Sequence, residues 1–101
     1  MAGIRKAGSI NNISEFLLER ANFYRHQLDY EKAEFDLEEA QEIIDRCGMK
    51  LYAVDAALLR GNLLCDKNQN ATEEYKTAKA LIEITGYHLR DNALKILEKR
   101  I

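Results

Sequence analysis

Proline is absent from this sequence of 101 residues, and so is tryptophan. A chain without proline lacks the strongest helix breaker, so its absence favours long uninterrupted helices. Glycine occurs at only five positions. Long apolar runs are also missing, and the longest ones are far too short to span a bilayer. No segment alternates apolar and polar residues for long enough to predict a strand.

The chain also has no strong excess of charge of one sign, because its net charge is −2 and acidic and basic residues are interspersed. No basic stripe is present, so neither nucleic acid nor an anionic membrane is expected as a partner. The N-terminus has no apolar core of the kind found in signal peptides, and we expect a cytoplasmic protein. Cys47 and Cys65, the only cysteines, are expected to be reduced and partly buried thiols, and a disulfide between them is the alternative.

Motifs for cofactors and metals are missing as well. The sequence has no glycine-rich phosphate loop, no HExxH and no paired cysteines at metal spacing. We therefore expect no cofactor, no metal and no enzymatic activity.

The spacing of apolar residues predicts five helices, of which the first follows Asn12 as its cap. Its apolar stripe is Ile13, Leu17, Ala21, Tyr24 and Leu28. The second helix is expected after Asp29 and ends near Cys47, with Gly48 available for the left-handed C-terminal position. Its stripe is Ala33, Leu37, Ala40 and Ile44.

The second half of the chain predicts three further helices. The third is expected over residues 50–66, and the fourth runs from its cap Asn70 to Gly86. Their stripes are Val54, Ala57, Gly61 and Leu64, and then Ala71, Tyr75, Ala78, Leu81 and Ile82. After a connector that His88 orders by hydrogen bonding, Asp91 caps a short last helix over 91–101. Its apolar face is Leu94, Leu97 and Ile101.

Two parts of the chain repeat each other. Arg, a small residue and Asn at 20–22 recur at 60–62, where glycine is the small residue. Glycine inside a helix costs roughly 1 kcal/mol relative to alanine, so Gly61 predicts a close helix crossing. The second and fourth helices share small, large, small residues at spacings of four and three. Self-similarity of this kind predicts stacked helical hairpins.

The repeat resembles the tetratricopeptide repeat (TPR), whose pattern combines small residues with large ones at fixed positions on two helices. The first repeat supplies Leu17, Ala21, Tyr24, Tyr30, Ala33, Leu37 and Ala40. The second supplies Ala57, Gly61, Leu64, Ala71, Tyr75 and Ala78. The offset of 38 to 40 residues exceeds the family's usual period, and no closing proline is present. Such longer repeats resemble those of large bacterial regulators, and the last segment looks like the C-terminal end of such an array.

This resemblance implies an all-α fold with two hairpins in a right-handed stack and a C-terminal capping helix. Residues 12–101 would form one domain, with repeat one at 12–48, repeat two at 49–86 and the cap at 91–101. Residues 1–11 are expected to be a flexible lead-in or a non-native remnant. The small residue on the first helix of a hairpin would let its second helix approach closely.

In the family, the first helix of each hairpin faces a concave groove that binds a peptide or a neighbouring domain. Asn22 and Asn62 would be its polar anchors, because an amide can pair with a peptide through both its donor and its acceptor. The other groove candidates are Glu15, Leu18, Arg25, His26, Asp55, Leu58 and Asp66. Leu18 stands where some members carry a lysine, so we expect no clamp for a terminal carboxylate. The tyrosines at 24, 30, 52 and 75 are expected to pack, with their hydroxyls at the rim.

Two alternatives to a binding module stay open. Arg20 and His26 have a spacing that resembles the HEPN ribonucleases, in which the arginine would stabilise a phosphate and the histidine would act as acid or base. Arg60 occupies the equivalent position with no histidine after it, so the repeat accounts for Arg20 without catalysis. A structural or oligomerisation element is the other alternative. The large apolar Phe16 and Phe23 lie on the first helix, which has no preceding neighbour, and either a longer parent protein or a homo-oligomer would cover that edge.

Overall fold

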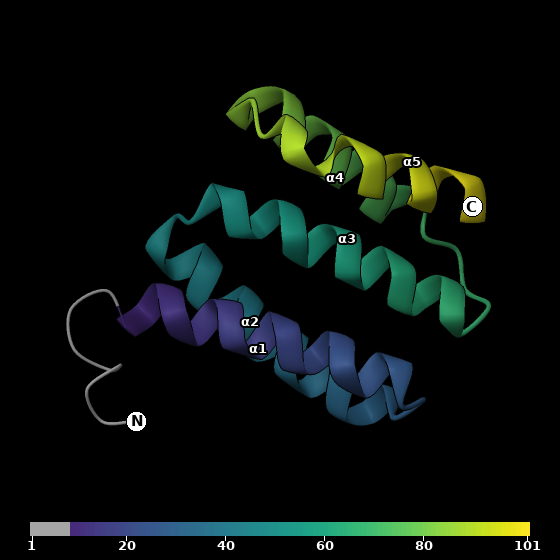
Figure 1. The fold of residues 1–101 in the computed structure, drawn as a ribbon, viewed down its shortest axis with the longest axis horizontal. Coiled ribbons are helices and arrows are strands. Elements are labelled where there is room, and N and C mark those ends of the chain that lie inside the picture. The colour runs from purple at the N-terminus through teal and green to yellow at the C-terminus, as the bar shows by residue number, and fades with distance from the viewer. Residues whose placement is uncertain (1–8) are drawn as a thin grey trace. The chain divides into compact units, whose positions relative to one another are not determined.

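The computed structural model describes the backbone of residues 9–101 and the side chains of residues 13–101. This described part is all-α and contains no strand, as predicted. In chain order the elements are α1 (Ser9–His26), α2 (Tyr30–Cys47), α3 (Lys50–Asp66), α4 (Thr72–Thr85), the 3₁₀ helix η2 (His88–Arg90) and α5 (Asp91–Arg100) (Figure 1).

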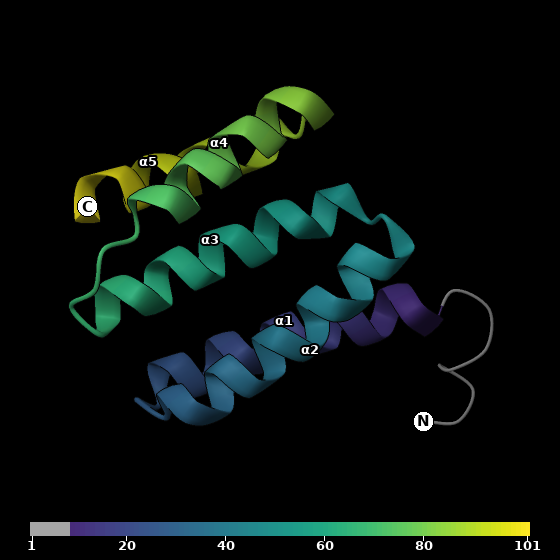
Figure 2. The same ribbon diagram turned by 180° about the vertical axis from the view of Figure 1, so that it is seen from behind.

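The chain divides into two compact units, Met1–Gly48 and Met49–Ile101. In the first unit α1 and α2 form a hairpin, and in the second α4 and α5 both pack along α3 (Figures 1 and 2). The division falls between the two predicted repeats, and the predicted capping helix belongs to the second unit.

Helix α2 begins and ends, and helix α4 ends, at the residues that the capping signals in the sequence predicted. Asp29 caps α2, and its carboxylate accepts a hydrogen bond from the backbone nitrogen of Lys32 at 3.4 Å. Gly48 and Gly86 follow α2 and α4 with φ angles of 67° and 72°, in the left-handed region that glycine adopts without a steric cost. The sequence predicted these three positions correctly.

Three helix starts differ from the prediction. The cap position of α5 is Arg90, so Asp91, the predicted cap, is the first residue of the helix. Helix α1 begins at Ser9, so Asn12 lies inside the helix rather than at its cap. This start lies within the predicted lead-in 1–11, of which residues 1–8 are outside the described part. The cap position of α4 is Ala71, one residue after Asn70, and the Asn70 side chain accepts from the backbone nitrogen of Thr72 at 2.8 Å. The Asn70 side chain therefore binds a backbone N–H group of the first turn of α4, although it lies one residue before the cap position.

Two residues of the predicted apolar stripes are exposed, because their helices end before them. Helix α1 stops at His26, and Leu28 takes a φ angle of 63° that leaves its side chain 73% exposed. Ile101 follows the last residue of α5 and is also exposed. Both are corrections to the expected core.

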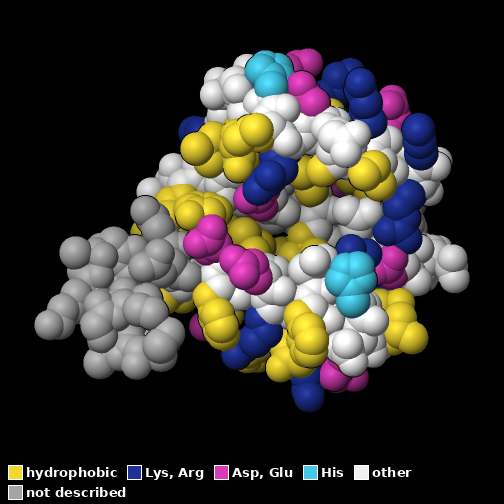
Figure 3. Space-filling model, in the orientation of Figure 1, with side chains coloured by type: hydrophobic (Ala, Val, Ile, Leu, Met, Phe, Trp, Pro, Cys, Tyr) yellow, Lys and Arg dark blue, Asp and Glu magenta, His cyan; other side chains and the backbone are white. Residues whose placement is uncertain are grey.

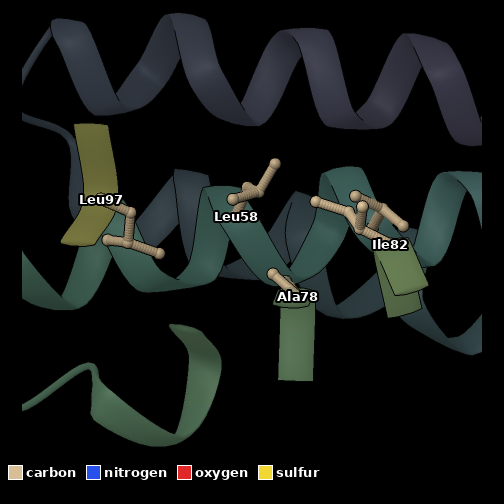
Figure 4. Packing of buried hydrophobic residues seen from close by; sticks show 6 residues of the cluster. Leu58, Ala78, Ile82 and Leu97 are labelled. Atoms are coloured by element: carbon tan, nitrogen blue, oxygen red, sulfur yellow. The ribbon is translucent and has the colours of Figure 1, made fainter. Parts of the chain in front are cut away.

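The remaining stripes are buried or half-buried. In the first unit the buried apolar residues are Leu17, Leu18, Ala21, Ala33, Leu37, Ala40 and Ile44. In the second unit one cluster joins three helices, and Leu58 comes from α3, Ala78 and Ile82 from α4, and Leu97 from α5 (Figure 4). Helix α3 also buries Ala56, Leu59 and Leu63.

Candidate functional site

The centre of the candidate site is the closest approach between α3 and α5, at Gly61. A Cβ atom on Gly61 would lie 2.7 Å from Cδ2 of Leu97 and 3.4 Å from Cβ of Glu74 on α4. The first distance is far below van der Waals contact, so Leu97 fills the space that a side chain at position 61 would need. The close crossing predicted at Gly61 is present, but its tightest neighbour is the last helix rather than the second helix of the hairpin.

An ion pair holds the N-terminal end of α5. Nε of Arg90 donates to Oδ1 of Asp55 at 2.5 Å, and Nη2 reaches Oδ2 at 3.5 Å. The hydrogen bond to Asp55 raises the pKa of the Arg90 guanidinium above its ordinary value, although partial burial opposes this. The guanidinium also lies 5.2 Å from the ring centroid of Tyr87. Next to it, His88 Nδ1 lies 3.0 Å from the Asp91 carboxylate, the kind of bond that was expected to order the connector.

A second set of polar contacts holds the C-terminal end of α5. Arg100 donates from Nη1 to Oδ1 of Asn62 at 2.9 Å and from Nη2 to Oδ1 of Asp66 at 2.6 Å. The Asn62 amide in turn donates to the carbonyl oxygen of Leu58 at 3.0 Å. Because Arg90 contacts the start of α3 and Arg100 its end, α5 runs parallel to α3 (Figure 1).

Helix α4 adds one polar contact to α5. The hydroxyl of Tyr75 donates to Oε2 of Glu98 at 3.1 Å. Desolvation and this hydrogen bond raise the pKa of the tyrosine above its ordinary value. The four tyrosines that were expected to pack, at positions 24, 30, 52 and 75, are all half-buried.

The groove candidates of the second repeat therefore lie at the place where α5 is seated. Asp55, Asn62 and Asp66 bind arginines at the two ends of α5, and Leu58 lies in the cluster that contains Leu97. We call this set, together with Gly61, the α5 seat. Sequence reasoning selected its polar residues but did not identify Arg90 and Arg100 as their partners.

The groove candidates of the first repeat are arranged differently. Asn22 is exposed, and its Oδ1 accepts from Nε and Nη2 of Arg25 at 3.2 and 3.1 Å. Its Nδ2 donates to no group in the described part of the chain. His26 is exposed at the end of α1, whereas Leu18 is buried. Asn22 is thus the anchor whose amide hydrogens are available to a guest.

The polar contact that sequence reasoning missed is a buried ion pair between α1 and α2. Arg20 donates from Nε and Nη2 to the two carboxylate oxygens of Asp36, at 2.7 and 2.8 Å. The Asp36 side chain is 3% exposed and that of Arg20 40%. The hydrogen bond to Asp36 raises the pKa of the Arg20 guanidinium. A signal was present, because Asp36 lies three residues after Ala33 and four before Ala40, on the apolar face of its helix.

This pair gives Arg20 a role within the hairpin, which bears on the ribonuclease alternative. The guanidinium that would have to contact a phosphate donates to Asp36 from Nε and Nη2, which leaves only Nη1 for a further acceptor. His26 is exposed and takes no part in these two hydrogen bonds. The geometry thus supplies a structural reason for the arginine.

The predicted self-association residues lie on the surface of α1. Phe16 is 57% exposed and Phe23 56%. The Arg20 guanidinium lies 5.1 Å from the Phe16 ring centroid, and the Phe23 ring packs edge to face on Tyr24. Figure 3 shows hydrophobic side chains along α1, with a basic side chain between them.

Both cysteines are free thiols, and Cys47 is exposed rather than partly buried because it is the last residue of α2. Within the described residues, no group of three histidine, cysteine or acidic side chains is arranged to hold a metal ion. Among the helices that the structure describes, none has the length and apolarity needed to cross a membrane. Comparisons with protein-family models, curated proteins and solved structures found no match for this chain.

Proposed function

We propose that this chain is a protein–protein interaction module of the tetratricopeptide type, in which two hairpins form a right-handed stack and present their first helices to a peptide or a neighbouring domain. The observation that carries the proposal is the α5 seat. There, a hairpin of this repeat receives another helix through a glycine at the crossing and polar groups at both ends. The seat is thus an intramolecular example of the recognition that the module would offer to another protein.

The small residues of the repeat support this assignment. Ala33 and Ala40 on α2, and Ala71 and Ala78 at the equivalent positions around α4, are all at most 1% exposed. Small buried residues at these spacings allow helices to approach closely, which is the basis of helical-repeat packing. Gly61 and Ala21 occupy the corresponding position on the first helices, and both are buried.

The first repeat offers the anchor for a guest. Asn62 accepts a hydrogen bond from Arg100, whereas Asn22 accepts from Arg25 of its own helix and keeps its amide hydrogens for a partner. A peptide backbone carbonyl is the natural acceptor for such a group, because it is present in every peptide regardless of sequence. The proposed guest is therefore a peptide segment of another protein, bound beside Asn22.

A peptide array probed with the full chain tests the proposal. We expect peptides that bind the wild type to lose binding to Asn22→Ala, because the change removes the amide and leaves the helix intact. Asn92→Ala is the matched control, since Asn92 is an exposed asparagine on α5, and it should bind as the wild type does. Equal binding by both variants, or an array without bound peptides, would contradict the assignment.

A further inference from the structure

The exposed face of α1 has a composition that favours pairing. Phe16 and Phe23 are seven residues apart, so both project from one face after nearly two helical turns. More than half of each side chain is exposed, at 57% and 56%. Two phenylalanines on one helix face form the kind of apolar patch that marks an interaction site.

Charges of opposite sign flank this apolar stripe. On an ideal helix Glu19 lies about 50° to one side of the line that joins the phenylalanines, and Arg20 lies about 50° to the other side. Glu19 is exposed. Arg20 uses Nε and Nη2 for Asp36, and its Nη1 is left for another acceptor. The face thus has the Glu19 carboxylate on one flank and, on the other, an arginine that keeps one donor nitrogen although Asp36 offsets part of its charge.

We propose that this face binds the same face of a second copy of the chain, with the two α1 helices parallel about a two-fold axis. In parallel helices related by such an axis, each flank meets the opposite flank of the partner, as at the e and g positions of a parallel coiled coil. Glu19 then lies opposite the second copy's Arg20, and Phe16 and Phe23 each face their own counterpart. An antiparallel pair would bring each flank against itself and place Glu19 against Glu19, so the charges select the parallel arrangement.

Sedimentation of the full chain over a range of concentrations tests the pairing. We expect a dimer in the wild type and a monomer in Phe23→Asp, because two carboxylates, one from each copy, would then face each other in the interface. Phe35→Asp is the matched control, since Phe35 is 71% exposed but lies on α2, outside this face, and it should leave the dimer intact. Glu19→Arg should weaken the dimer by placing arginine opposite arginine, and it should do so less at high salt.

A cysteine at position 16 tests the orientation. In a chain that also carries Cys47→Ser and Cys65→Ser, Phe16→Cys should form an intermolecular disulfide on oxidation, because each position 16 faces its counterpart only in the parallel pair. Failure of this cross-link in a chain that still dimerises would overturn the parallel arrangement. A wild type that stays monomeric at every concentration, or a Phe23→Asp variant that dimerises unchanged, would overturn the proposal and leave the face to another occupant.

Discussion

At the scale of single residues, Gly61 shows how a missing side chain determines helix packing. The space beside its Cα atom is filled by the side chain of Leu97, which is fully buried. We expect Gly61→Val to destabilise the protein by about 1–3 kcal/mol, because a branched side chain must displace Leu97. Ala80→Val, on an exposed part of α4, should cost only about 0.5 kcal/mol through helix propensity. Urea denaturation measures both, and a Gly61→Val cost no larger than that of Ala80→Val would contradict the close crossing.

Ser14 carries a hydroxyl group in a place where no described residue offers it a hydrogen-bond partner. Its hydroxyl is fully buried and finds no hydrogen-bond partner in the described part of the chain. We expect Ser14→Ala to stabilise the protein by about 1 kcal/mol, since it removes a desolvated hydroxyl and improves helix propensity. Thermal unfolding measures the change, and a destabilised variant would show that the hydroxyl is bonded in solution.

The pair of Arg20 and Asp36 predicts an unequal response to the loss of either partner. Arg20→Met leaves a carboxylate that is 3% exposed without a counter-charge, and we expect a cost of about 3 kcal/mol. Asp36→Asn leaves an arginine that is 40% exposed and can turn to water, so its cost should be about 1 kcal/mol. Chemical denaturation of the two variants gives the comparison, and equal costs would contradict the role assigned to burial.

At the scale of elements, the sequence predicted where the helices begin and end better than it predicted which side chains pair between helices. Asp29, Gly48 and Gly86 act within a few residues of chain, so local rules were sufficient to place the helix ends. Leu28 was wrongly placed in the core because periodicity extends an apolar stripe past the point where a helix stops. The pairing of Arg20 with Asp36 and of Arg100 with Asp66 depends on which helices meet, and spacing along one helix does not contain that information.

The α5 seat combines apolar packing with ion pairs, and we expect the packing to contribute more to stability than the ion pairs. Leu97→Ala should destabilise the second unit by about 2–5 kcal/mol, because it leaves a cavity in the buried cluster. Arg90→Ala and Arg100→Ala should each cost no more than about 1 kcal/mol, since both ion pairs are partly open to solvent. Hydrogen exchange of the α5 amides reports the seating directly. An arginine variant that exposes α5 as much as Leu97→Ala would show that charge holds the helix.

At the scale of the whole molecule, the division at Gly48 predicts that the two units differ in their ability to fold alone. The second unit closes a core from three helices, to which α3, α4 and α5 all contribute. The first unit is a two-helix hairpin that buries an ionised Asp36 and an unpaired hydroxyl at Ser14. A two-helix hairpin buries little apolar surface relative to the entropy of ordering its chain.

We therefore expect a fragment of residues 49–101 to be helical and to melt cooperatively, with a free energy of unfolding no greater than about 3 kcal/mol, as is usual for so small a core. A fragment of residues 9–48 should show little helix under the same conditions. Circular dichroism measures both, and Leu97→Ala in the longer fragment is the control, because the loss of its central side chain should abolish the transition. If residues 49–101 were unfolded while residues 9–48 kept their helices, the assignment of the self-sufficient core to the second unit would be wrong, and the stability of the chain would have to come from the hairpin of α1 and α2.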